Sequence, residues 1–174
     1  MLHDDGACRH LMGTRIPPIA LPSTDGGTVD LAAIPGRVVL YIYPRTSRSD
    51  EPPLEGWDAI PGARGCTAES CAFRDRHVEL RSLNVAGVYG LSTQDGEYQR
   101  EMVRRLNLPF PVLSDENLRL AAALRLPTFT VRGQVLLKRA TLLIDDGTIR
   151  RVFYPINAPA RHPDEVLAWI RSSQ

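Results

Sequence analysis

One stretch of sequence decides the fold class of this chain: Val38-Val39-Leu40-Tyr41-Ile42-Tyr43, followed by Pro44. Each of these six side chains before the proline is apolar or aromatic, which is typical of a strand covered on both faces. Such strands lie in the centre of α/β sheets. Because proline has no N–H to donate to a neighbouring strand, we expect the strand to end at Pro44.

The segments around this strand show strand and helix patterns in turn. Residues 19–34 predict a β-hairpin, which turns at Asp25-Gly26-Gly27. Apolar spacing and capping residues predict helices over 67–83, 95–106, from Ser114 or Asp115 to 124, and 163–170. Further strands are predicted over 85–91, 111–114, 135–144 and 148–154, the last two joined at Asp145-Asp146-Gly147. This order predicts an α/β sandwich around a mixed sheet.

Length and charge exclude several classes of protein. The 174 residues suit a single domain over 1–174, and 21 Lys+Arg against 20 Asp+Glu leave a net charge of +1. A near-neutral chain argues against a nucleic-acid binder. No apolar run approaches the roughly 20 residues of a membrane span, and the first residues lack the apolar core of a signal peptide. We therefore expect a cytoplasmic protein without nucleic-acid or membrane partners.

Residues 45–65 form a long polar segment rich in proline and glycine. A stretch of this length without regular structure is uncommon inside a compact domain, and is commonly functional or disordered. Too little chain precedes it for it to link two domains. The segment contains one large aromatic residue, Trp57. This residue either anchors a lid or docking surface or packs the loop against the core.

The three cysteines, Cys8, Cys66 and Cys71, are too few and odd in number for a disulfide-stapled secreted scaffold. They are therefore core residues or reagents. Cys66 follows a glycine at the start of a predicted helix, where the helix dipole and free N–H groups favour the thiolate and lower the thiol pKa. On an unbroken helix, Cys66 and Cys71 have Cα atoms about 8.7 Å apart, beyond the ~7 Å limit of a disulfide. Pairing would require local unwinding.

Two stretches resemble the active-site region of peroxiredoxins of the PrxQ, or bacterioferritin-comigratory, type. They are Tyr41-Ile42-Tyr43-Pro44 and Gly65-Cys66-Thr67-Ala68-Glu69-Ser70-Cys71-Ala72-Phe73-Arg74-Asp75. The resemblance continues through 90–93, 108–115 and 138–147, and covers about 19–170. It implies a thioredoxin-like fold with an N-terminal hairpin. It also implies a thiol peroxidase that reduces hydrogen peroxide or small alkyl hydroperoxides without a bound cofactor or metal.

The resemblance also implies roles for individual residues. Cys66 matches the cysteine that attacks peroxide and becomes a sulfenic acid, and Cys71 matches the one that then forms an intramolecular disulfide with it. Thioredoxin or a similar thiol donor would reduce this disulfide, and the enzyme would be a monomer or weak homodimer. Arg139, in Arg139-Ala140-Thr141, matches the arginine that stabilises the thiolate and the leaving oxygen.

The chain departs from the family pattern P-x-x-x-[TS]-x-x-C. Ala63 stands three residues before Cys66, where the pattern has a hydroxyl, and Pro44 lies 66 − 44 = 22 residues before it. We interpret 45–63 as an inserted active-site loop and 1–16 as an N-terminal extension. Either Pro44 with Thr46, in preference to Ser47, still lines the substrate site and the insertion bulges outward, or the role of the hydroxyl has been lost or moved.

Two other functions remain open from the sequence. One is a thiol–disulfide oxidoreductase on the same fold, which the C-x4-C spacing disfavours. The other is a peroxide-sensing redox switch with little turnover. Among the remaining candidates, His77 and His162 are interpreted as packing and helix-entry residues, and Cys8 as a spare thiol rather than a metal ligand with His3 and His10.

Overall fold

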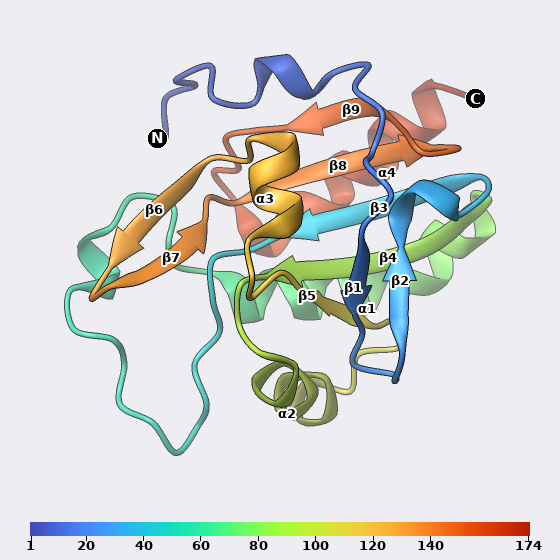
Figure 1. Ribbon diagram of the computed structural model, residues 1–174. Coiled ribbons are helices and arrows are strands. Elements are labelled where there is room, and N and C mark those ends of the chain that lie inside the picture. Colours follow the sequence, from blue (N-terminus) through green and yellow to red (C-terminus); the bar gives the residue numbers. More distant parts are fainter.

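The computed structural model describes residues 1–174 and has a mixed five-stranded sheet at its centre (Figure 1). The strand order is β5-β4-β3-β8-β9, with bounds Val112–Ser114, Val85–Ser92, Arg37–Ile42, Ala140–Asp145 and Thr148–Phe153. β3 is the middle strand, parallel to β4 and antiparallel to β8. The prediction of a buried central strand in a mixed sheet is confirmed.

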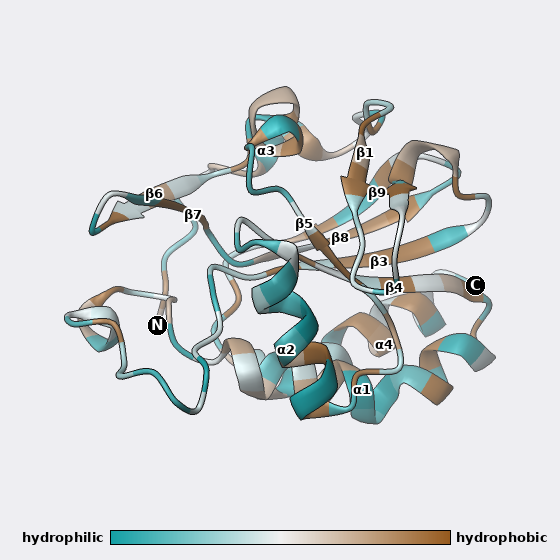
Figure 2. Ribbon diagram, turned by 60° about the horizontal axis from the view of Figure 1, so that its bottom comes forward, coloured by the Kyte–Doolittle hydropathy of each residue, from teal (hydrophilic) through white to brown (hydrophobic).

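Alternate side chains of β3 divide the core into two layers. Val38, Leu40 and Ile42 pack on one face, with the N-terminal hairpin and α3, Arg119–Leu124. Val39 and Tyr41 pack on the other, with the three helices α1, Cys66–Ser82, α2, Gly96–Leu106, and α4, His162–Ser172. Figure 2 shows the three longer helices below the sheet and α3 with β1 above it. Because side chains alternate along a strand, an all-apolar strand needs both layers.

The expected hairpin is formed by β1, Ala20–Pro22, and β2, Thr28–Asp30. The residues before it also contribute to the core, since Cys8, Leu11 and Ile16 are buried. Four short 3-10 helices complete the structure: Arg9–Leu11, Leu31–Ala33, Trp57–Ala59 and Pro159–Arg161. None of the helices has the length and apolar character that crossing a bilayer would need.

The strand predicted over 135–144 is wrong, because it is two strands in two sheets. β7, Gln134–Leu137, pairs with β6, Thr128–Val131, a strand that the sequence did not predict, and β8 begins only at Ala140. Ala140 is paired with Ile42, the last residue of β3. β3 ends at this residue and Pro44 follows, so the residues that precede Ala140 have no strand to pair with in the central sheet. The chain therefore lies outside the sheet at Lys138 and Arg139.

Helix ends follow the predicted capping residues closely. The side chain of Asp95 accepts a hydrogen bond from Tyr98 N at 2.8 Å and caps α2. The carboxylate of Asp115 accepts from the N–H groups of Leu120 and Ala121 at 3.0 and 2.8 Å. Asp115 thus binds N–H groups of the first turn of α3, but the helix starts at Arg119 with Leu118 at its N-cap position, later than the predicted start at Ser114 or Asp115.

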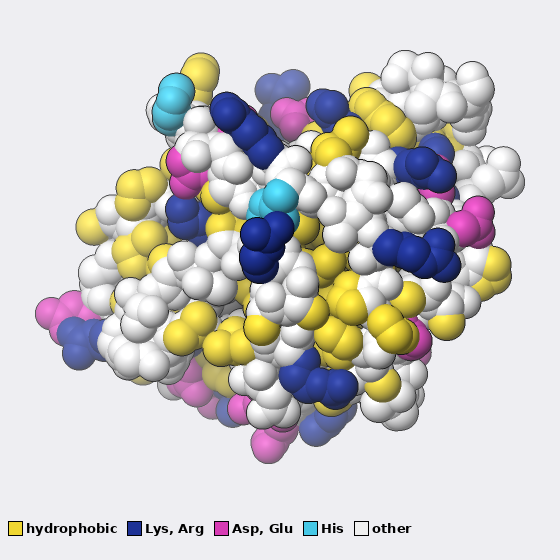
Figure 3. Space-filling model, turned by 45° about the horizontal axis from the view of Figure 1, so that its top comes forward, with side chains coloured by type: hydrophobic (Ala, Val, Ile, Leu, Met, Phe, Trp, Pro, Cys, Tyr) yellow, Lys and Arg dark blue, Asp and Glu magenta, His cyan; other side chains and the backbone are white.

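Surface charge is dispersed on the face shown in Figure 3, where Lys and Arg side chains stand singly among hydrophobic and uncharged groups. The arrangement agrees with the nearly balanced count of 21 basic and 20 acidic residues.

Candidate active site

Cys66 lies where three segments of the chain meet. It is the first residue of α1, is 4% exposed, and follows Gly65, which has a φ of 103°. Its sulfur lies 3.1 Å from Nη2 of Arg139 and donates to the carbonyl oxygen of Ala63 at 3.5 Å. The main-chain N–H of Arg45 favours the charged form of the same sulfur and lowers its pKa. The start of α1, the two ends of the 45–63 loop and the break before β8 thus surround one thiol.

Arg139 is buried and its guanidinium is shared among several acceptors. Besides the Cys66 sulfur, Nη2 donates to the carbonyl oxygens of Ala63 and Arg64 at 3.2 and 3.0 Å. Nη1 donates to the carboxylate of Glu69, and both side chains of this ion pair are almost fully buried. The rigid fork of arginine suits this arrangement, because it holds one fixed positive charge against the sulfur.

Glu69 is the main site residue to which the sequence interpretation assigned no role. It lies one turn after Cys66 on the buried face of α1, and burial raises its pKa from 4.5 to about 7, against the effect of Arg139. Glu69 lies three residues after Cys66 and four before Phe73, which places it on the same face of the helix as both. This spacing was the sequence signal that could have identified it. A carboxylate on an apolar helix stripe is seldom buried without a cationic partner.

Burial of the sulfur raises the pKa of the Cys66 thiol, while Arg139 and the N–H of Arg45 oppose this. This differs from the sequence argument, which predicted a lowered pKa from the helix N-terminus. The physical reason is that removing the sulfur from water disfavours the charged form more than the nearby donors favour it. The ionised neighbour Glu69 adds to the same direction.

Cys71 lies on α1 but points away from Cys66. Five residues of helix turn it by about 140°, and it is partly buried against the core layer that contains Met102 and Leu106. Both cysteines are free thiols in an unbroken helix. The structure therefore does not bring the two sulfurs together in this state. Cys8, the third free thiol, is buried in the other core layer.

Pro44 and Thr46 lie at the start of the loop, on either side of Arg45. Pro44 is buried and Thr46 is 2% exposed. The hydroxyl of Thr46 lies 3.4 Å from Oε1 of Gln94, so its hydrogen bond is directed at that side chain rather than at Cys66. A contact between either residue and a substrate stays a prediction.

The 45–63 loop passes beside the β6–β7 hairpin (Figure 1), and side chains of the body contact it at several places. Near its start, the hydroxyl of Tyr98 accepts from Arg48 N at 3.1 Å and donates to Glu51 at 2.7 Å. Near its end, Trp57 packs on Phe129 of β6 with ring centroids 6.3 Å apart. A second contact to the β6–β7 hairpin is the ion pair of Glu55 and Arg132.

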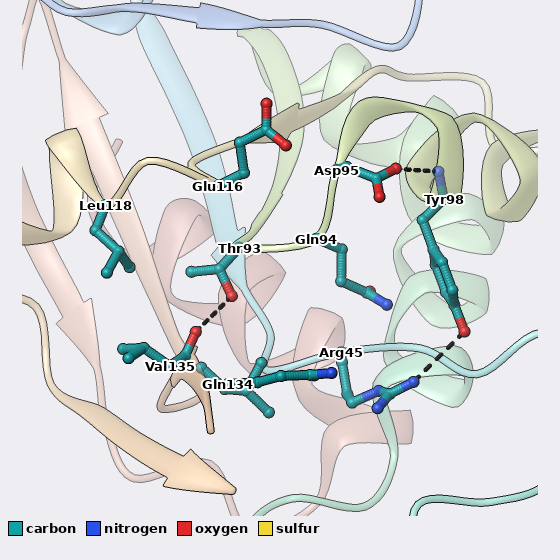
Figure 4. A pocket seen from close by; sticks show the side chains of 10 residues that line it. Arg45, Thr93, Gln94, Asp95, Tyr98, Glu116, Leu118, Gln134 and Val135 are labelled. Carbon is teal, nitrogen blue, oxygen red and sulfur yellow. Dashed lines mark hydrogen bonds between the residues drawn. The ribbon is translucent and has the colours of Figure 1, made fainter. Parts of the chain in front are cut away.

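A polar cavity of about 420 Å³ lies between the start of the loop, the N-terminus of α2 and β7 (Figure 4). Arg45 and Gln94 both line it, and the Arg45 guanidinium points toward Tyr98. Thr93 is tied to the opposite wall by a hydrogen bond to the carbonyl oxygen of Val135 at 2.8 Å. Arg45 therefore contacts Cys66 through its main chain and the cavity through its side chain.

The two histidines outside the N-terminal segment differ in environment. His162 is fully buried at the start of α4, and its ring nitrogens lie 2.9 Å from Oγ1 of Thr141 and 3.2 Å from Glu165. His77 is half-buried, packs near Phe110, and has its pKa lowered by burial. Neither ring contacts Cys66, and both pack as the sequence predicted.

Comparisons with known proteins point to one family. The family model described as Redoxin matches residues 11–167. Peroxiredoxin Bcp of Escherichia coli is 30% identical over 164 residues, which cover 91% of this chain and 94% of that protein. Chloroplastic peroxiredoxin Q of Sedum lineare is 29% identical, over 92% of this chain and 77% of its own length.

A solved structure agrees with the sequence relatives. The crystal structure of peroxidoxin BcpB from Mycobacterium tuberculosis superposes with a TM-score of 0.76 and 26% identity, covering 94% of this chain and 97% of that one. The thioredoxin-like fold that the resemblance implied is thus confirmed. The chain belongs to the redoxin family, as a peroxiredoxin of the PrxQ/Bcp type, and is a thiol-dependent peroxidase.

Proposed function

We propose that Cys66 is the thiol that attacks the peroxide and that Arg139 stabilises the charges of this step. The observation that carries the proposal is the 3.1 Å contact of Nη2 of Arg139 with the Cys66 sulfur inside a buried site. A fixed positive charge in a water-poor site acts strongly on a thiolate and on negative charge that develops near it.

The first step forms an S–O bond and breaks the O–O bond. The Cys66 thiolate attacks one peroxide oxygen and becomes a sulfenic acid, while the other oxygen leaves as hydroxide or alkoxide and takes up a proton. The guanidinium of Arg139 and the N–H of Arg45 face the sulfur where this charge moves. Pro44 and Thr46 are proposed to border the space that the peroxide enters, because both are buried beside Arg45.

The second step couples chemistry to a change of the helix. Cys71 attacks the sulfenic sulfur, a disulfide forms, and the oxygen leaves as water. Because the two thiols lie on different sides of α1, its first turns must open for the sulfurs to meet. A thioredoxin-type reductant then reduces the disulfide by thiol exchange and returns both cysteines to thiols.

Family membership supports turnover rather than the two alternatives, a thiol–disulfide oxidoreductase and a sensor with little turnover. We further propose that the enzyme acts in the cytoplasm, where a reducing pool keeps free thiols such as its three cysteines unpaired. Its oligomeric state is proposed to be a monomer or a weak homodimer.

The experiment that tests these roles compares cysteine variants in peroxide consumption with a dithiol reductant. We expect Cys66→Ser to lose activity and Cys71→Ser to form one sulfenic acid per chain and then stop with thioredoxin as donor. Cys8→Ser is the matched control and should retain activity, because Cys8 lies in the other core layer. Activity that survives in Cys66→Ser would overturn the assignment.

A further inference from the structure

The start of the 45–63 loop is buried although it belongs to no strand or helix. The ladder of the central sheet continues one residue past β3, where Tyr43 N donates to Leu91 O at 3.0 Å. Pro44 is buried and Thr46 is 2% exposed beyond that point. Buried main-chain N–H and C=O groups need hydrogen-bond partners, so the main chain of Thr46 must be satisfied from elsewhere.

The side chain of Gln94 supplies these partners. Its Oε1 accepts from the main-chain N–H of Thr46 at 2.9 Å, and its Nε2 donates to the carbonyl oxygen of Thr46 at 2.9 Å. The carboxamide thus binds both main-chain groups of one residue, as a neighbouring strand would do. Gln94 thus fixes the main chain of the residue that directly follows Arg45.

Gln94 is itself held firmly at the edge of the sheet. Its N–H donates to the hydroxyl of Ser92 at 3.3 Å, and its carbonyl oxygen accepts from the hydroxyl of Ser114 at 2.6 Å. Both serines are buried and end the strands β4 and β5. The side chain of Gln99 donates to Ser92 at 2.9 Å and completes the support. Through these hydrogen bonds, Gln94 fixes the position of Thr46 relative to the central sheet.

We propose that Gln94 is a positioning residue for the peroxidase reaction, because it holds the main chain of Thr46 and so keeps the Arg45 N–H directed at the Cys66 sulfur. This inference rests on the proposed role of Cys66 as the reacting thiol. It concerns only how a donor to that thiol is kept in place.

Three features make such a donor important in this chain. Ala63, three residues before Cys66, has no side-chain donor, and it presents its carbonyl oxygen to the sulfur. Nη2 of Arg139 divides its donors between the sulfur and main-chain carbonyls. When a buried thiolate loses a hydrogen-bond donor, the free-energy cost of its removal from water is no longer offset by that donor.

The side chain of Arg45 does not hold the loop in this position. Its Nη2 atom lies 3.5 Å from the hydroxyl of Tyr98, a long contact, and the polar cavity borders the guanidinium (Figure 4). The close 2.9 Å contacts are those of Gln94 with Thr46. The Gln94 contacts are those next to the Arg45 main chain, whereas Arg105 binds the carbonyl oxygen of Ser47 and Tyr98 binds the N–H of Arg48 further along the loop.

The test uses Gln94→Met, which keeps the length of the side chain and removes both hydrogen bonds. It is measured in a Cys8→Ser, Cys71→Ser background, where Cys66 is the one thiol. We expect the pH midpoint of Cys66 alkylation by iodoacetamide to rise by about one unit. The rate of sulfenic acid formation with hydrogen peroxide near neutral pH should fall roughly tenfold, as expected for a lost hydrogen bond to a charged group.

The matched control is Gln134→Met, the same exchange on another wall of the cavity (Figure 4). Its alkylation midpoint and peroxide rate should stay within about twofold of the parent, since a group without a bond to the active-site loop has only weak effects. Gln94→Asn is the second variant. It retains the amide but is one methylene short, and should change both readouts in the same direction as Gln94→Met.

A folded Gln94→Met protein with an unchanged alkylation midpoint and an unchanged peroxide rate would overturn the inference. If Gln94→Met does not fold, the same result for Gln94→Asn would overturn it. Peroxidase activity of the full chain that survives Cys66→Ser would instead overturn the proposed function, so the two failures are distinguishable.

Discussion

Nη2 of Arg139 lies 3.1 Å from the sulfur of Cys66, while Nη1 of the same guanidinium bonds to the buried carboxylate of Glu69. Cys66 and Glu69 are one turn apart on α1, and Arg139 comes from the two-residue break between β7 and β8. One cation thus contacts a buried carboxylate and the thiol that we propose to react with peroxide. Changes at either partner should affect reactivity and stability in different ways.

Replacing Arg139 should mainly slow the reaction of Cys66 with peroxide. We expect Arg139→Met to lower the second-order rate with hydrogen peroxide about 100-fold, the usual cost of removing a donor that stabilises developing negative charge. Arg139→Lys should lie between this variant and the parent, since an ammonium keeps the charge without the fork. Stopped-flow measurement of sulfenic acid formation checks both.

Loss of the guanidinium also leaves Glu69 buried without its partner. The double variant Arg139→Met, Glu69→Gln should therefore recover much of the stability lost in Arg139→Met, but none of the rate. Arg150→Met, on the exposed side of β9, is the control and should react as the parent does. A double variant that regains the parent rate would contradict the role of Arg139.

Glu69 should give the stability of the enzyme a characteristic dependence on pH. Its pKa is raised from 4.5 to about 7 in the folded state by burial. The folded state therefore binds a proton more tightly than the unfolded state, and this contribution is complete below pH 4.5 and lost as the pH rises through about 7. The shift corresponds to about 3 kcal/mol, from 1.36 kcal/mol per unit.

Urea unfolding at several pH values measures this contribution. Glu69→Gln has no group to titrate at this position, so the difference in unfolding free energy between parent and variant should change by about 3 kcal/mol across that interval. Glu116→Gln, an exposed carboxylate, should follow the parent throughout. A constant difference between parent and Glu69→Gln would show that Glu69 has an ordinary pKa.

The layers of the fold were predictable because their signals are local. An apolar run identifies the central strand wherever its neighbours lie, and Asp95 and Asp115 are recognisable caps. The break at Lys138 and Arg139 was not, because it depends on where β3 ends in another part of the chain. An apolar run such as 135–137 predicts a strand, but its periodicity does not tell which sheet the strand joins.

The same distinction applies to the site. A sequence motif predicted Cys66 and Arg139 as site residues, and the structure brings these two side chains together. Glu69 could have been added from its helical spacing to Cys66. Gln94 carried no signal, because its contacts with Thr46 join residues 48 positions apart and use a side chain common on surfaces. Contacts of a carboxamide with a distant main chain are decided by the final packing, which single-sequence patterns do not contain.

Trp57 should hold the far part of the inserted loop against the β6–β7 hairpin. Trp57→Ala removes its contact with Phe129 and should weaken this attachment by about 1 kcal/mol, with trypsin cleaving after Arg48 or Arg64 about fivefold faster. Trp169→Ala, on α4, is the control and should not raise cleavage in the loop. Equal cleavage of parent and Trp57→Ala would show that Glu55 and Arg132 suffice.

Formation of a disulfide between Cys66 and Cys71 should remove helix from the first turns of α1. In the unbroken helix the two Cα atoms are about 8.7 Å apart, beyond the ~7 Å that a disulfide spans. We therefore expect one equivalent of peroxide to reduce the far-ultraviolet helical signal by roughly four to six residues, about the length that contains both cysteines. A dithiol reductant should restore it.

The change is specific only if it requires both thiols. Peroxide-treated Cys71→Ser should form the sulfenic acid and keep its full helical signal, because no bond then pulls Cys66 across the helix. Cys8→Ser should respond as the parent does, since Cys8 belongs to the opposite core layer. A Cys66–Cys71 disulfide, identified by mass spectrometry in a protein of unchanged helix content, would mean that α1 accommodates the bond without opening. The coupling of the redox step to a conformational change would then be wrong.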